Sequence, residues 1–203
     1  MMRRRNWLQW PVLLLVFSTA AGATGLASAQ TPGALTLDEV LRSIVKERVP
    51  VVTYVETRHL SMLDQPLVAK GEMQFTPPDQ LEKRAISPRP ERMSLKGQTL
   101  SLERGGREVS IQLSSQPQAQ GFVDSIRALL MGQRDVLERS YAVRLSGELA
   151  EWKLTLYPKD ADVEKLVKRI DVQGERGQIR QIEYSQAGGD RTVMEIAPKG
   201  RQP

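Results

Sequence analysis

Strict alternation of apolar and polar side chains recurs along this 203-residue chain and constrains its fold more than any other feature. Residues 109–113 and 152–156 show it most clearly. About eleven such short runs follow one another, separated by Gly- and Pro-containing turns such as Gly105-Gly106. Runs that are apolar on one face only are typical of an antiparallel sheet with one solvated side. A one-sided sheet this wide is expected to twist and to curl toward a barrel.

Helical periodicity is confined to a few segments. Thr36 with Glu39 forms a capping box and predicts a helix that ends near Glu47. Residues 118–131 carry an apolar stripe that ends at Gly132, and short helices are expected at 134–139 and 160–166. The two or three helices available as a lid are too few to cover the apolar face of the sheet. The pattern therefore predicts an α+β, mostly β fold, in which the helices form a lid over an apolar space.

The first residues have the pattern of an export signal. Arg3-Arg4-Arg5 precede the apolar run 11–17, and Ala27-Ser28-Ala29 provides a small-residue cleavage site. We expect a signal peptide over 1–29, cleaved after Ala29, and export to the periplasm; the alternative is a membrane anchor, for which the apolar run is short. The remainder, 30–203, is expected to be a single domain, with a disordered linker at 30–35 and a disordered tail at 199–203.

Composition excludes several classes of function. Cys is absent, so the chain has no disulfides, thiolate ligands or lipid-modified cysteine, and its single histidine, His59, is expected on the solvated strand face. Without the three leader arginines the net charge falls from +5 to +2, which gives little support to nucleic-acid binding. The acidic residues of 160–164 lack the central Gly of a calcium loop. We expect no metal, no cofactor and no catalytic residue.

The apolar stripes provide the candidate ligand site. If the curled sheet is not filled by its lid, the residues expected to line a cavity are Tyr54, Leu60, Met62, Met73, Phe75, Met93, Phe122, Ile126, Leu130, Trp152, Leu154 and Met194. The alternative is that these side chains fill a solid core. Alternation from Val49 predicts a long first strand that carries Tyr54, Glu56, Arg58, Leu60 and Met62 on one face. Glu56 and Arg58 are therefore expected either to contact a ligand head group or the lid, or to form an ordinary ion pair.

Short motifs in a fixed order carry a family resemblance over nearly the whole mature chain. They are Tyr54-x-Glu56, Glu56-Thr57-Arg58, Pro66-Leu67, Gly71-x-Met73-x-Phe75-x-x-Pro78-Asp79-x-Leu81 and Leu129-Leu130-x-Gly132. In this order they resemble the LolA-like family, which is related to the periplasmic outer-membrane lipoprotein carrier LolA. The resemblance implies an unclosed eleven-stranded β-barrel, a helical lid and a hydrophobic cavity that accepts acyl chains. Residues 76–81 lack the arginine that latches the lid in the founding members, so no latch residue is assigned.

Three functions remain open at this point. The leading hypothesis is a monomeric periplasmic carrier of lipoprotein acyl chains or another lipid, such as a polyene or glycolipid. The resemblance implies an inner-membrane exporter and an outer-membrane acceptor as its partners. The second hypothesis is a sensory or regulatory module of the same fold that binds a partner protein in response to lipid or lipoprotein. The third is an enzyme that acts on a lipid-like substrate through Glu56 or His59.

Overall fold

The computed structural model describes residues 34–186, 188–201 and 203, so the expected signal peptide over 1–29 and most of the expected linker lie outside the described residues. The helices are α1 (Leu37–Lys46), the 3-10 turn η1 (Leu113–Ser115), α2 (Pro117–Met131), α3 (Arg134–Ser140) and α4 (Ala161–Leu166). The strands are β1 (Val51–His59), β2 (Leu67–Thr76), β3 (Gln80–Ser87), β4 (Glu91–Lys96), β5 (Thr99–Arg104), β6 (Arg107–Gln112), β7 (Tyr141–Glu148), β8 (Glu151–Pro158), β9 (Arg169–Glu175), β10 (Gln178–Ser185) and β11 (Arg191–Pro198).

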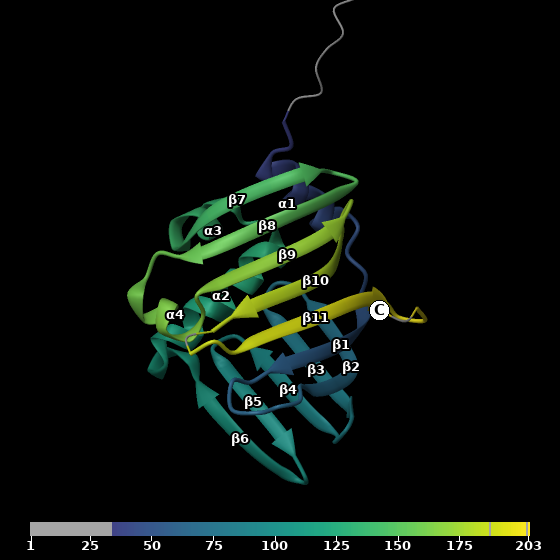
Figure 1. Ribbon diagram of the computed structural model, residues 1–203, viewed down its shortest axis with the longest axis vertical. Coiled ribbons are helices and arrows are strands. Elements are labelled where there is room, and N and C mark those ends of the chain that lie inside the picture. Colours follow the sequence, from purple (N-terminus) through teal and green to yellow (C-terminus); the bar gives the residue numbers. More distant parts are fainter. Residues whose placement is uncertain (1–33, 187, 202) are drawn as a thin grey trace, which may run out of the picture. The chain divides into compact units, whose positions relative to one another are not determined.

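All eleven strands belong to one antiparallel sheet, in the order β6-β5-β4-β3-β2-β1-β11-β10-β9-β8-β7 (Figure 1). Each strand pairs with its sequence neighbour, except at the centre, where β1 pairs with β11. Strands β6 and β7 form the two edges, and within the described residues no hydrogen-bonded pairing joins them. The sheet is thus an unclosed barrel of eleven strands, which confirms the predicted fold class.

The segment that connects the two edge strands, β6 and β7, contains helices. After β6 the chain must cross from one edge of the sheet to the other before β7 begins, and η1, α2 and α3 occupy this crossing. Helices α1, α2 and α3 contact one another, and α1 packs on β10 while α3 packs on β7. In Figure 1 these helices lie behind strands β7 to β10. None of the helices in the described part of the chain has the length and apolarity that a membrane span requires.

The local signals at the helix ends are confirmed. Glu39 N–H donates to Thr36 Oγ1 at 3.3 Å, and Thr36 N–H donates to a Glu39 carboxylate oxygen at 2.9 Å, which completes the capping box of α1. Helix α2 ends at Gly132, which adopts the left-handed conformation at φ 70°. Asp160 caps α4 through its side chain. These contacts satisfy backbone groups that a helix end otherwise leaves unpaired.

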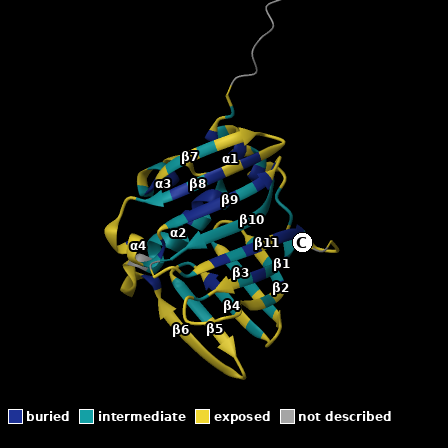
Figure 2. Ribbon diagram, in the orientation of Figure 1, coloured by how far each residue is buried: buried dark blue, intermediate teal, exposed yellow. Residues whose placement is uncertain are grey.

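The principal core lies between helices α1 to α4 and the β7–β10 half of the sheet. Leu154 and Val40 are fully buried in it, and Trp152 is 1% exposed. The indole N–H of Trp152 donates to the Arg176 carbonyl at 2.6 Å, so the one polar atom of this large side chain is satisfied. Figure 2 shows buried residues concentrated in β8 and β9, whereas β6 is exposed along its length. The two halves of the sheet therefore differ in how completely the helices cover them.

One predicted strand boundary is wrong. Alternation carries the first strand to Met62, but β1 ends at His59. Its neighbour β11 begins at Arg191, opposite His59, and β2 begins at Leu67, opposite Arg58, so further residues would have no strand to pair with. Residues 60–66 instead form a turn, in which Ser61 N–H donates to the Asp190 carboxylate at 2.8 Å.

Candidate functional site

An apolar cavity of about 240 Å³ lies between the inner face of the sheet and the helices. The helical segments and the α1–β1 connection contribute Ile44, Arg48, Val49, Phe122, Ser125, Ile126, Leu129 and Leu130 to its wall. Strands β1–β4 contribute Val52, Met73, Phe75, Leu81, Lys83 and Met93. Strands β8–β11 contribute Leu156, Ile170, Val172, Ile179, Ile182, Tyr184, Met194 and Ile196. Both halves of the sheet therefore form the cavity, and α2 covers it.

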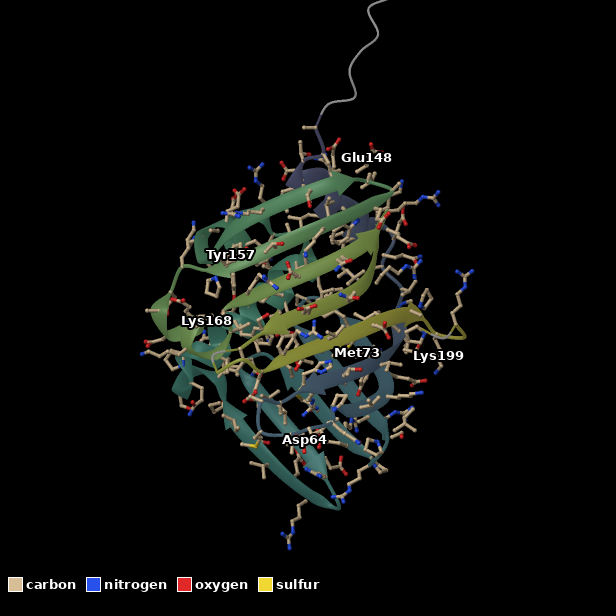
Figure 3. All side chains as sticks on the ribbon, viewed as in Figure 1. Asp64, Met73, Glu148, Tyr157, Lys168 and Lys199 are labelled. Atoms are coloured by element: carbon tan, nitrogen blue, oxygen red, sulfur yellow. The ribbon has the colours of Figure 1, made fainter. Side chains whose placement is uncertain are left out.

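Strand register explains why these residues share one face. Val52 lies opposite Met73, Met73 opposite Lys83, and Lys83 opposite Met93, so a single cross-strand row runs from β1 to β4. Residues directly opposite each other in antiparallel strands point to the same side of the sheet. Figure 3 labels Met73, which lies in this row near the middle of the sheet. A thioether and long apolar side chains give such a wall an adaptable surface.

Two arginines hold the C-terminal part of α2 against the rest of the domain. Arg48 donates to the Leu130 carbonyl, and its guanidinium lies 5.1 Å from the ring centroid of Phe75. Arg127 donates to the carbonyls of Gly97 and, at 3.4 Å, of Asp79. These contacts tie α2 to the turns at the ends of β2 and β4. Guanidinium groups are suited to this task because each carries several donors and stays charged.

A charged cluster lies beside the apolar wall. Glu56 is 1% exposed, and its two carboxylate oxygens accept from Arg58 on the same strand and from Lys83 on β3. The Lys83 ammonium also lies 4.9 Å from the ring centroid of Tyr54. Lys83 reaches Glu56 across β2, where Ala69 and Gly71 leave the inner face open.

Burial shifts the proton equilibria of this cluster. It lowers the pKa of Lys83 to about 8, although the carboxylate of Glu91 acts against this shift. Burial also raises the pKa of Tyr54 to about 12, because the phenolate would form in an apolar environment. Among the described residues the Tyr54 hydroxyl has no hydrogen-bond partner. The cluster thus combines a compensated carboxylate, a partly desolvated ammonium and an unpaired hydroxyl.

The residues singled out in the sequence fall into four groups. Seven of them line the cavity: Met73, Phe75, Met93, Phe122, Ile126, Leu130 and Met194. Trp152 and Leu154 lie in the principal core, whereas Tyr54 packs against Met194 and Ile196 beside the cavity wall. Leu60 and Met62 lie in the turn after β1, where Met62 is 85% exposed. Glu56 and Arg58 form an ion pair, which was one of the two alternatives for them, and His59 is exposed at the end of β1.

Sequence reasoning did not select Arg48, Arg127 or Lys83. Both arginines donate to backbone carbonyls, which every residue has, so no side-chain pattern indicated the contacts. Lys83 had a detectable signal, because it shares the apolar face of a strand with Leu81 and Ala85. A lysine at such a position points inward and needs a partner.

A comparison with known families matches residues 29–200 to the model described as outer membrane lipoprotein carrier protein LolA-like. The chain belongs to this LolA-like family. The match spans the whole sheet and its helices, in agreement with the resemblance seen in the sequence motifs. Among curated proteins, no sequence match was found.

Solved structures similar to this LolA-like chain share little sequence with it. A LolA superfamily protein from Nitrosomonas europaea is 12% identical, with 84% of this chain and 96% of that chain covered and a TM-score of 0.41. Lipoprotein LppX from Mycobacterium tuberculosis is 10% identical, with 79% and 92% covered and a TM-score of 0.42. The MucA/MucB complex of Pseudomonas aeruginosa includes a chain that is 14% identical, with 82% of this chain and 56% of that chain covered and a TM-score of 0.38.

Proposed function

We propose that this LolA-like protein is a carrier that binds acyl chains or another lipid in its cavity and moves lipoprotein or lipid cargo toward the outer membrane. The observation that carries the proposal is the apolar cavity between the inner sheet face and α2. Its wall is formed mainly by aliphatic, aromatic and methionine side chains, which suit an unbranched hydrocarbon. Membership of the LolA-like family supports the same function.

Burial of hydrocarbon is the source of affinity in this proposal. Each CH2 group that leaves water for the cavity contributes about 0.8 kcal/mol, so even part of an acyl chain gives useful binding. Because binding depends on burial rather than on covalent chemistry, release requires only that an acceptor bind the same chain more tightly. The carrier therefore catalyses no reaction, and none of its residues is assigned a catalytic role.

Helix α2 acts as the lid in this mechanism. The contacts of Arg48 and Arg127 with backbone carbonyls hold the C-terminal part of α2 over the cavity. Carbonyl acceptors are readily replaced by water when the helix moves, since water satisfies both the donor and the acceptor. Cargo enters and leaves as α2 lifts from the sheet and exposes Ile126 and Leu130.

The site of action follows from the export signal. We propose that residues 1–29 are cleaved and that the chain from Gln30 onward works in the periplasm as a single domain. An inner-membrane exporter would load it and an outer-membrane acceptor would unload it. The Glu56–Arg58 pair lies beside the cavity, where it can face the polar end of a bound lipid.

The deciding experiment is native mass spectrometry of the protein purified from periplasm, followed by extraction and identification of bound lipid. Binding of the fluorescent apolar probe phenylnaphthylamine is measured in parallel. Met93→Trp fills the cavity from β4, whereas Lys96→Trp places the same side chain at an exposed position at the end of that strand. We expect a bound lipid or acylated peptide in the wild type, its loss in Met93→Trp, and its retention in Lys96→Trp.

The outcomes separate the candidate functions. Equal lipid and probe binding in Met93→Trp and Lys96→Trp would contradict cavity-based carriage. A wild type that carries no lipid, binds no probe and instead co-purifies with a membrane-bound regulator would favour the regulatory module. Unchanged function in Glu56→Ala and His59→Ala would remove the support for an enzyme.

A further inference from the structure

The charged cluster beside the cavity has an excess of positive charge. Lys83 and Arg58 both pair with the single carboxylate of Glu56. The next charged residues on this face are Glu91 on β4 and Arg104 on β5, which pair with each other at 3.8 Å. Arg107 on β6 lies opposite Arg104, so two carboxylates face four cations on this side of the sheet. A cluster with uncompensated cations, of which Lys83 is partly buried, favours a bound anion.

Lys83 brings this excess charge to the cavity itself. Of the described residues of β1–β6 that line the cavity, Lys83 alone is charged, and its side chain is only 16% exposed. Its ammonium carries three donors, and Glu56 is the one carboxylate within ion-pair distance of it among the described residues. Donor capacity is therefore left over at the boundary between the apolar wall and the charged cluster.

Tyr54 supplies a second unused donor next to the same wall. Its side chain is 1% exposed, its hydroxyl has no partner among the described residues, and its ring packs against Met194 and Ile196. The Lys83 ammonium lies over this ring. A buried hydroxyl without a partner costs free energy, which a ligand oxygen at this position would recover.

We propose that Lys83, with Tyr54 beside it, forms an anion subsite that binds the carboxylate or phosphate head group of a lipid whose hydrocarbon chain occupies the cavity. The proposal rests on the proposed carrier function and names the class of cargo: anionic amphiphiles rather than neutral lipids. Glu56 pairs with Lys83 and therefore competes with a ligand anion for its donors. Burial lowers the pKa of Lys83 to about 8, so the ammonium is still largely charged at neutral pH.

The test is displacement of phenylnaphthylamine by matched ligands. Palmitate and methyl palmitate share one hydrocarbon chain and differ in head-group charge, and hexadecyl phosphate provides the phosphate arm. One charge-assisted hydrogen bond in a partly buried site corresponds to about a tenfold change in Kd. We expect wild type to bind palmitate or hexadecyl phosphate about tenfold more tightly than methyl palmitate. The tighter of these two anions identifies the head group.

Variants distinguish head-group binding from a merely structural ion pair. Lys83→Met should abolish the preference for the anion over methyl palmitate, with both ligands measured on the same variant. Glu56→Gln should strengthen this preference, because Lys83 loses its competing carboxylate. Lys70→Met, at an exposed position on β2, should change nothing. If Lys83→Met unfolds because Glu56 keeps only Arg58 as a partner, the double variant E56Q/K83M carries the same test.

Two results would overturn the subsite and one would overturn carriage itself. Equal binding of palmitate, hexadecyl phosphate and methyl palmitate by wild type refutes the anion subsite and leaves the carrier function standing. Retention of the anion preference in folded Lys83→Met or in E56Q/K83M does the same. Failure of phenylnaphthylamine and of all three lipids to bind refutes the carrier function.

Discussion

Replacement of Tyr54 by phenylalanine tests the environment beside the cavity most directly. The side chain is 1% exposed, and burial raises the pKa of its hydroxyl from 10 to about 12. At about 1.4 kcal/mol for each tenfold change, this difference is linked to about 3 kcal/mol of folding free energy. Below pH 10 the tyrosine is protonated in both the folded and the unfolded chain, so this contribution is fully present.

The sign of the pH dependence follows from that linkage. Between about pH 10 and pH 12 the unfolded chain loses the Tyr54 proton and the folded chain keeps it, so the free energy of unfolding falls. Tyr54→Phe cannot ionise and should show a shallower fall over this range, smaller by up to about 3 kcal/mol. At neutral pH it should be about 1 kcal/mol more stable than wild type, because it removes a buried hydroxyl that has no partner.

Urea titrations followed by tryptophan fluorescence provide the assay. Trp152 is the only tryptophan from Gln30 onward and is 1% exposed, so its emission reports unfolding. Burial also raises the pKa of Tyr141, but this residue is present in both proteins, and the difference between them isolates Tyr54. Parallel pH profiles for wild type and Tyr54→Phe between about pH 10 and pH 12 would refute the reasoning.

Other substitutions test separate parts of the structure. A Cβ at Gly71 would overlap the Arg84 carbonyl, so Gly71→Ala should lower the free energy of unfolding, measured in urea, by about 2 kcal/mol. An unchanged free energy would show that β2 and β3 are less tightly paired. Leu154→Ala should lower the free energy of unfolding by about 2–5 kcal/mol yet leave phenylnaphthylamine affinity intact, since Leu154 lies in the core and not on the cavity wall. A matching loss of probe affinity would contradict this placement. Arg127→Met should accelerate probe exchange in stopped flow without a comparable loss of equilibrium affinity, and an unchanged rate would argue against α2 as the lid. The preference for palmitate over methyl palmitate should decline as the pH rises through about 8, where Lys83 loses its proton amid Glu56, Arg58 and Glu91; a flat profile would contradict that role for Lys83.

Features encoded by neighbouring residues were predictable from the sequence. The capping box of Thr36 and Glu39 and the stop at Gly132 depend only on residues within one helical turn, and both are confirmed. The strand faces follow from alternation, which placed Met73 and Met93 correctly on the inner side. One-sided alternation over so many runs also predicted a sheet that curls toward a barrel, and the family resemblance implied that the barrel is unclosed.

Features encoded by distant partners were not predictable in the same way. The end of β1 depends on where β11 and β2 begin, so alternation alone carried the strand too far toward Met62. Alternation also cannot separate core from cavity, and Leu154 and Met194 lie on the same face of one sheet with different surroundings. The hydrogen bond from Arg48 to the Leu130 carbonyl has no sequence signal, because every residue carries a backbone carbonyl.

The pairing of β1 with β11 has a consequence for how the chain folds. Strands β1–β6 and β7–β11 each form a meander of consecutive hairpins, whose contacts are local in sequence and close with little loss of chain entropy. The central pairing joins the two ends of the domain, as in the match of Val52 with Pro198. Contacts of such long sequence separation form slowly, so we expect the joining of the two meanders to limit the folding rate. Substitutions at this central pairing should therefore slow refolding more than equally destabilising substitutions within a hairpin.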